Sequence, residues 1–124
     1  MTGRPKTEYQ IQCEVMEWTR KNRDRLPALH WFHCSLNGVK LSPGQATKAV
    51  KSGLKAGIPD LFFPLPNEDY YGLFIELKRP GGKLSDRQEQ CLAYLRHVGY
   101  QAVVCYSTRE AIEAIEEYIQ LLVI

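Results

Sequence analysis

The sequence lacks the features of membrane proteins, secreted proteins and repeat proteins. No apolar run in its 124 residues approaches the roughly 20 residues that a membrane-spanning helix needs, and the N-terminal segment lacks the apolar centre of a signal peptide. Internal repeats and low-complexity segments are also missing. We therefore expect a cytoplasmic protein with a flexible lead over residues 1–6 and one globular domain over residues 7–124.

Cysteine pairs with metal-binding spacing are missing as well. The chain has four cysteines, at positions 13, 34, 91 and 105, and no C-x-x-C motif. In a reducing compartment, scattered cysteines of this kind are typical of buried free thiols. His30, His33 and Cys34 are close in sequence, but two side chains three residues apart on a strand point to opposite faces. This spacing argues against a structural zinc site.

Acidic residues are missing from residues 35–59, a stretch that contains four lysines. The formal net charge of the whole chain is only +2, but the charge is unevenly distributed. Residues 1–88 contain 14 Lys or Arg against 9 Asp or Glu, whereas residues 89–124 contain 2 against 5. Such asymmetry within one domain is typical of a surface that contacts phosphate groups, although a solvated lysine face has the same composition.

Hydrophobic periodicity and capping residues predict alternating helices and strands. Helices are expected from Thr7 to about Arg20, over residues 43–52, from Ser85 to about His97, and after Ser107. Strands are expected over residues 29–34, around Asp60, around Glu76, and over residues 101–106. Asn37-Gly38 is a turn signal that could close a hairpin with Val39–Leu41. The last helix has an apolar stripe at Ile112, Ile115, Ile119 and Leu122.

Three ionisable residues occur in apolar, strand-forming runs. Asp60 precedes Leu-Phe-Phe, and Glu76 and Lys78 stand in the run Gly72–Pro80. Residues i and i+2 of a strand share a face, so pairing with the Asp60 strand would bring two carboxylates and one ammonium together. Burial of unpaired charge is costly, and a divalent cation would balance this cluster. The alternative is a self-satisfied salt bridge, which would leave Asp60 without a partner.

The order Pro59-Asp60, then Glu76-Leu77-Lys78, resembles the PD-(D/E)XK nuclease superfamily. With the lead-in Gly53-Leu-Lys-Ala-Gly57 and the continuation Leu84-Ser-Asp-Arg-Gln88, the chain is similar to the VRR-NUC family from about Thr7 to the C-terminus. This resemblance implies a restriction-endonuclease-like α/β core. A small mixed sheet would be flanked by helices in the order α-β-β-β-α-β-α, with one short inserted helix.

The resemblance also implies a function. It predicts a metal-dependent DNA endonuclease that hydrolyses phosphodiester bonds, with Mg²⁺ or Mn²⁺ as cofactor. Standalone domains that resemble this chain occur in phages and prophages, and they look like homodimers that cut branched DNA, as a Holliday-junction resolvase does. The compartment would be a bacterial cell or a phage-infected host cell. A flap, fork or RNA endonuclease of the same fold, and a DNA-binding module without catalysis, stay open as alternatives.

The catalytic residues implied by the resemblance are Asp60, Glu76, Lys78 and Gln88. Asp60 and Glu76 would bind the metal, with the main-chain carbonyl of Ile75 or Leu77 as a neutral ligand. Lys78 would orient the attacking water or neutralise charge on the phosphate. Gln88 would support the lysine region, although its place three residues after Ser85 also fits a helix capping box.

The first helix supplies a further candidate ligand. Relatives that the chain resembles place a metal-binding Glu there, and Glu8, four residues before Gln12, matches their Glu-x-x-x-Gln pattern. Helical geometry alone does not choose between acids, because Glu8 and Glu14 flank Ile11 at about 60° on either side. A first-turn acid favoured by the helix dipole is the other interpretation of Glu8.

Two further groups of residues are candidates for binding surfaces. The candidates for DNA contact are Lys48, Lys51, Lys55, Arg79 and Lys83. The three lysines fall at i, i+3 and i+7, so they would share a face if the helix over residues 43–52 extended that far. The C-terminal run, residues 121–124, is more apolar than a last helix needs, and it would either form part of a dimer interface or complete the core.

Overall fold

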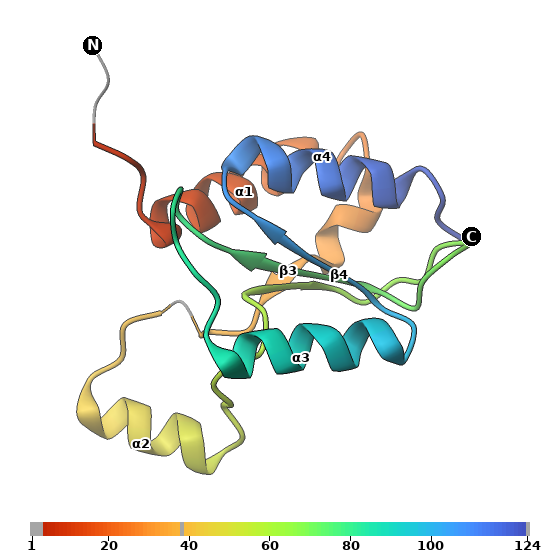
Figure 1. Ribbon diagram of the computed structural model, residues 1–124. Helices are drawn as coiled ribbons and strands as arrows, with labels where there is room; N and C mark the ends of the chain where they lie inside the picture. The colour runs from red at the N-terminus through yellow and green to blue at the C-terminus, as the bar shows by residue number, and fades with distance from the viewer. Residues whose placement is uncertain (1–3, 38, 124) are drawn as a thin grey trace.

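A mixed sheet with helices on both faces forms the body of the protein (Figure 1). The computed structural model describes residues 4–37 and 39–123. The elements are α1 (Glu8–Asn22), the 3-10 helix η1 (Pro27–Trp31), β1 (His33–Cys34), α2 (Pro43–Lys51), β2 (Leu61–Phe63), β3 (Leu73–Leu77), α3 (Asp86–His97), β4 (Gln101–Cys105) and α4 (Thr108–Ile119). Apart from η1, this order is the predicted one, so the fold class is confirmed. Within these residues, no helix has both the length and the apolar character needed to span a membrane.

The sheet has the strand order β1-β2-β3-β4. Strand β2 runs antiparallel to both β1 and β3, whereas β3 and β4 are parallel. The register pairs Leu61 with Ile75 and Leu77 with Cys105, and these side chains join the core formed with α1 and α4. The opposite face of the sheet is turned toward α3 (Figure 1). Because helices lie on both faces, the strands are apolar along nearly their whole length.

Helix α1 begins at the predicted cap. The Thr7 side chain accepts the Gln10 N–H, and the Gln10 side chain accepts the Thr7 N–H, which is a complete capping box. Ile11 and Val15 are buried, and Trp18 packs against the edge of the core. The predicted apolar stripe is therefore confirmed, and it fixes α1 on the sheet.

The strand predicted over residues 29–34 is wrong for most of its length. Residues Pro27–Trp31 form η1 instead, and only His33–Cys34 pair with β2. Pro27 accounts for the difference, since its ring fixes φ near the helical value and it has no N–H for a strand ladder. Leu29 and Phe32 are nevertheless buried, so the apolar pattern correctly marked core residues in an element of the wrong type.

The turn at Asn37 does not close the predicted hairpin. Val39–Leu41 are described and form no strand, and Cys34 pairs with Leu61 of β2. Gly38, the second half of the turn signal, lies outside the described residues. The Asn37 side chain is directed elsewhere, because its Nδ2 donates to the carbonyl oxygen of Ile58 at 2.9 Å.

Helix α2 stands apart from the sheet (Figure 1). It begins at Ser42 with a capping box, as in α1, but none of its nine residues is buried. The helix ends at Lys51, so Lys55 falls beyond it, and the predicted three-lysine face is reduced to Lys48 and Lys51. Both of these lysines are exposed. A helix this short is marginal in water on its own, so the cap is an important source of its stability.

Helix α4 packs on the sheet through a stripe that overlaps the predicted one only in part. Its buried residues are Ala111, Ile115 and Tyr118, while the predicted positions 112 and 119 are half-buried. Tyr118 can be buried because its hydroxyl donates to the carbonyl oxygen of Leu65 at 2.7 Å. The prediction counted only aliphatic residues, and it therefore missed the alanine and the tyrosine that face the sheet.

The C-terminal tail pairs with the connection between β2 and β3. The Glu68 N–H donates to the carbonyl oxygen of Leu121 at 2.8 Å, and Asn67 and Leu122 form an isolated bridge. Leu122 packs against the core, whereas Leu121 and Val123 are exposed. Residue 124 lies outside the described part. The tail thus completes the core with one side chain and presents two others to solvent.

The four cysteines are free thiols, as predicted, but they are not all buried. Only Cys105 is buried, Cys13 is exposed, and Cys34 and Cys91 are half-buried. The burial expectation was therefore wrong for three positions. Burial raises the pKa of the Cys105 thiol to about 12, so this thiol is unreactive at neutral pH.

Candidate active site

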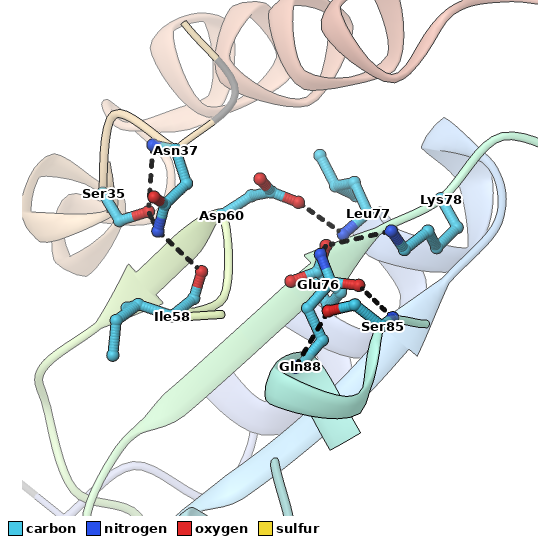
Figure 2. A network of polar contacts seen from close by, with 9 residues as sticks. All are labelled: Ser35, Asn37, Ile58, Asp60, Glu76, Leu77, Lys78, Ser85 and Gln88. Carbon is cyan, nitrogen blue, oxygen red and sulfur yellow. Dashed lines mark hydrogen bonds and ion pairs between the residues drawn. The ribbon is translucent and has the colours of Figure 1, made fainter. Parts of the chain in front are cut away.

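Asp60 lies directly before β2 and reaches across to β3. Asp60 is 9% exposed, and its Oδ2 accepts a hydrogen bond from the main-chain N–H of Leu77 at 2.8 Å (Figure 2). The carboxylate is therefore held at the end of the neighbouring strand. A self-satisfied salt bridge between Glu76 and Lys78 would therefore not leave Asp60 without a partner, because this amide supplies one.

Glu76 and Lys78 point to the same side of β3, as the period of a strand predicts (Figure 2). Glu76 is 2% exposed and Lys78 is 8% exposed. The Lys78 Nζ lies 3.9 Å from Glu76 Oε2, which is an ion pair too long to be a hydrogen bond. Lys78 thus offsets the charge of Glu76, and its ammonium can still donate to another acceptor.

Gln88 forms the predicted capping box and also contacts the acid on β3, two residues before Lys78. Its side-chain oxygen accepts the Ser85 N–H at 2.9 Å, and its backbone N–H donates to the Ser85 hydroxyl, which completes the capping box of α3. Its Nε2 donates to Glu76 Oε2 at 3.3 Å. The two ends of one amide therefore join the start of α3 to the buried acid on β3 (Figure 2).

Glu8, and not Glu14, is the α1 acid whose charge acts on these strands. The charge of Glu8 contributes to raising the pKa of both Asp60 and Glu76. Glu14 is engaged elsewhere, because its Oε1 accepts hydrogen bonds from Lys6 Nζ at 2.8 Å and from the Thr108 hydroxyl at 2.6 Å. These two bonds lower the pKa of Glu14. The hydrogen bonds of Glu14 and the charge effect of Glu8 thus distinguish two acids that the helix period could not.

The electrostatics of the cluster disfavour two charged carboxylates. Burial raises the pKa of Glu76 to about 8, and the nearby charge of Asp60 adds to the effect. Burial also raises the pKa of Asp60, although the Leu77 N–H opposes the shift. The charge of Glu8 also raises the pKa of both acids, and Lys78 is the cation that the cluster holds. The site therefore carries an excess of negative charge once its acids ionise.

The donor set suits a hard divalent cation. Carboxylate and carbonyl oxygens are the ligands that Mg²⁺ and Mn²⁺ prefer, and Mg²⁺ is often held by only one or two carboxylates together with water. In a strand, the N–H and C=O of one residue point the same way, so the Leu77 carbonyl is directed toward the same side as the amide that binds Asp60. Across residues 4–37 and 39–123, no three His, Cys, Asp or Glu side chains are gathered closely enough to hold an ion by themselves. The residues present fit a cation bound by Asp60 and Glu76, a main-chain oxygen and water.

The predicted DNA-contact residues occupy two separate segments. Lys48 and Lys51 lie on α2 and Lys55 follows it, whereas Arg79 and Lys83 lie in the loop between β3 and α3. All five side chains are exposed. The loop of Arg79 and Lys83 starts directly after Lys78, at the end of the strand that carries Glu76.

A polar turn behind Asp60 was missed by the sequence analysis. The Ser35 N–H donates to the carbonyl oxygen of Asp60 at 2.9 Å, and the Asn37 side chain contacts Ile58 (Figure 2). Asn37 and Ile58 are 21 residues apart. Turn chemistry identified the Asn37 position in the sequence, but no local signal indicates which distant carbonyl its amide contacts.

We predict that the metal-free protein loses stability as the pH rises from 4.5 to about 8. In this window Glu76 stays protonated in the folded state and is ionised in the unfolded chain, so the folded state binds more protons and higher pH favours unfolding. One such group gives a slope of at most about 1.4 kcal/mol per pH unit. Denaturant unfolding with chelator present should show the free energy of unfolding falling over this pH range, and Glu76→Gln should make this dependence on pH weaker.

Glu17→Gln is the matched control, because Glu17 is an exposed α1 acid. Its stability curve should keep the wild-type slope. If Glu76→Gln and the wild type have parallel curves, Glu76 does not hold its proton in the folded state. Glu14 does not disturb the comparison, because a lowered pKa affects stability only as the pH falls below its ordinary value of 4.5.

Comparisons with known proteins agree with this geometry. The VRR-NUC domain family matches residues 6–109. A solved structure of a "VRR_NUC domain protein" is 30% identical in sequence, with a TM-score of 0.77 over 94% of this chain and 91% of that chain. No curated protein matches the sequence. The match covers most of the chain, including every residue of the buried cluster, and the chain therefore belongs to the VRR-NUC domain family, a family of the nuclease type.

Proposed function

We propose that this domain is an Mg²⁺- or Mn²⁺-dependent DNA endonuclease that hydrolyses phosphodiester bonds. The observation that carries the proposal is the burial of Asp60 and Glu76 side by side, with the charge of Glu8 added and Lys78 as their cation. Such a cluster is costly in a fold without a ligand, and a divalent cation removes the cost. Membership of a nuclease-type family supports the same chemistry.

Asp60 and Glu76 are the proposed protein ligands, with the Leu77 carbonyl as a neutral ligand. Glu8 is the proposed third acid, since its charge acts on both carboxylates. A divalent cation bound there would lower the pKa of a water molecule and polarise the phosphate. Lys78, whose ammonium is not hydrogen-bonded to Glu76, would orient the water or stabilise charge on the phosphate. Gln88 holds the Glu76 side chain in place through Oε2.

The exposed basic residues would hold the DNA backbone. Arg79 and Lys83 lie in the loop that follows β3, and Lys48 and Lys51 lie on α2 with Lys55 beyond it. Lysine and arginine contacts with phosphate give affinity without sequence preference, and they make binding depend steeply on salt. In this proposal α2 binds DNA outside the catalytic cluster.

Branched DNA, a four-way junction above all, is the proposed substrate, and a homodimer is the proposed active form. One chain has one catalytic cluster, which cuts one strand, whereas symmetric cleavage of a junction requires two clusters related by an axis. Leu121 and Val123 are exposed on the C-terminal tail, and Val123 lines an apolar groove together with Leu26, Pro27, Ala28, Leu65 and Pro66. Apolar surface of this kind supports an interface with a second copy.

We predict that Asp60→Asn and Glu76→Gln abolish cation-dependent cleavage while the fold persists. Each change keeps the shape of the side chain and removes one charged ligand, and Lys78→Ala should likewise stop cleavage without loss of metal binding. Cleavage of flap, fork, four-way and linear DNA, and of RNA, would be measured with Mg²⁺, Mn²⁺ or chelator. Asp24→Asn, which neutralises an exposed acid in the connection between α1 and η1, is the control. Full cleavage by both carboxylate variants would remove the nuclease assignment.

The helix acids are tested in the same series. Glu8→Gln should reduce cleavage, whereas Glu14→Gln should leave it near the wild-type level, because Glu14 is bonded to Lys6 and Thr108. Glu14→Gln serves as the matched control for a neutralised acid on α1. A larger loss with Glu14→Gln than with Glu8→Gln would contradict the proposed third acid.

We predict that the double change Lys48→Ala and Lys51→Ala weakens DNA binding and lowers its salt dependence. Each lost phosphate contact should reduce the log–log salt slope by about one unit. Binding would be measured by fluorescence anisotropy over a range of salt, with chelator present to prevent cleavage. Arg20→Ala with Lys21→Ala removes two exposed charges from the end of α1 and should leave the slope unchanged. If the two double variants have equal log–log salt slopes, Lys48 and Lys51 form a solvated face and do not contact phosphate.

We predict that light scattering finds a dimer and that the two opposed strands of a junction are cut in one binding event. Val123→Glu should yield monomers that only nick, because the added charge would be buried at the proposed interface. Val98→Glu, which adds a charge at an exposed position after α3, should remain dimeric. A monomeric wild type that nicks single strands would instead support the flap or fork alternative.

A further inference from the structure

The turn before α2 contains a non-glycine residue in an unusual backbone conformation. Leu36 has a φ of 70°, in the left-handed region that side chains larger than glycine rarely adopt. The Val39 N–H donates to the Leu36 carbonyl oxygen at 3.1 Å and closes the turn. This conformation directs the next side chain, Asn37, toward the main chain of Ile58. Backbone strain of this kind persists only where surrounding contacts hold it.

Asn37 and Ser35 together hold the segment that leads into Asp60. The Asn37 Nδ2 donates to the Ile58 carbonyl oxygen at 2.9 Å and lies 3.3 Å from the Ser35 hydroxyl oxygen. The Ser35 N–H donates to the Asp60 carbonyl oxygen at 2.9 Å. The carbonyl groups of Ile58 and Asp60, on either side of Pro59, are therefore bonded to Asn37 and Ser35 respectively.

Helix α3 packs closely against the start of the same segment, at Gly57. Gly57 has a φ of 91°, and a Cβ at this position would lie 3.0 Å from both the Cβ and the carbonyl oxygen of Arg87. The chain thus passes against the α3 backbone with no room for a side chain, and then meets the Asn37 amide. The contact of Gly57 with α3 and the hydrogen bonds of Ile58 and Asp60 therefore restrain the backbone of this segment.

We infer that Asn37 is a positioning residue for Asp60: its amide fixes the Ile58 carbonyl, and thereby sets the place from which the Asp60 carboxylate reaches Leu77. The inference rests on the proposed function only for the consequence in metal binding. A side chain that donates is required at this position, since the partner is a carbonyl oxygen. If the donor is removed, the segment can move, and the 2.8 Å bond between Asp60 Oδ2 and the Leu77 N–H loosens with it.

A purely local role for Asn37 makes a different prediction. Asparagine often stabilises the turn in which it lies, and loss of that role would lower the stability of the whole protein without a specific effect on Leu77. A positioning role acts on the Leu77 amide selectively, because Asp60 Oδ2 is the acceptor of that amide. Hydrogen exchange at single amides separates the two roles without any metal or substrate.

The test compares Asn37→Ala and Asn37→Asp with the wild type and with Thr47→Ala. Asn37→Ala removes the donor, Asn37→Asp keeps the shape but offers an acceptor, and Thr47→Ala removes an exposed hydroxyl whose hydrogen bond stays within α2. In metal-free protein, NMR-detected exchange of the Leu77 amide should accelerate in both Asn37 variants relative to the Val103 amide of β4. Thr47→Ala should leave the ratio unchanged. An equal acceleration at Leu77 and Val103 would overturn the inference.

Mn²⁺ titration followed by electron paramagnetic resonance is the second readout. Loss of a residue that orients a metal ligand commonly weakens metal affinity by about tenfold or more, and this loss is expected in both Asn37 variants. If the Leu77 amide exchanges faster in the Asn37 variants while their Mn²⁺ affinity is unchanged, Asn37 has no role in metal binding. A wild type that binds no Mn²⁺ would refute the proposed metal site, while the exchange ratio would still decide whether Asn37 positions Asp60.

Discussion

The burial of two carboxylates on adjacent strands is the constraint on which the rest of the structure depends. Asp60 and Glu76 would repel each other if both were charged, and their burial limits the screening of this repulsion by solvent. The protein opposes this repulsion with an ion pair from Lys78, an amide from Gln88 and a main-chain N–H from Leu77. The apolar core on the other face of the sheet must offset the cost that remains.

The same constraint explains why segments far apart in sequence converge at one end of the sheet. The acids stand where β2 begins and β3 ends, so any group that contacts them must come from a connection or from a helix end. The first turn of α3 provides Gln88, which contacts Glu76, and the first turn of α1 carries Glu8, whose charge acts on both acids. Rigid helices therefore hold the parts that must be accurate, while the exposed charges lie on a loop and on α2.

Local chemistry was enough to predict most of the elements and the centre of the site. Capping residues marked the starts of α1 and α3, and the two-residue period of a strand placed Glu76 and Lys78 on one face. Pro27 was the reason for the main error, because apolar spacing marks buried residues but does not distinguish a short strand from a 3-10 turn. Glu8 and Glu14 could not be separated for another reason. Thr108, which engages Glu14, lies 94 residues away, and only the tertiary fold brings it near.

The two buried carboxylates are each engaged through one particular oxygen. Asp60 uses Oδ2 for the Leu77 amide, and Glu76 uses Oε2 for both Gln88 and Lys78. The contacts with the Leu77 amide, Gln88 and Lys78 thus use one oxygen of each acid, Oδ2 of Asp60 and Oε2 of Glu76. Such an arrangement favours monodentate binding of a cation by each carboxylate over bidentate binding. It suits a small ion with strict octahedral geometry better than a larger ion that accepts both oxygens of a carboxylate.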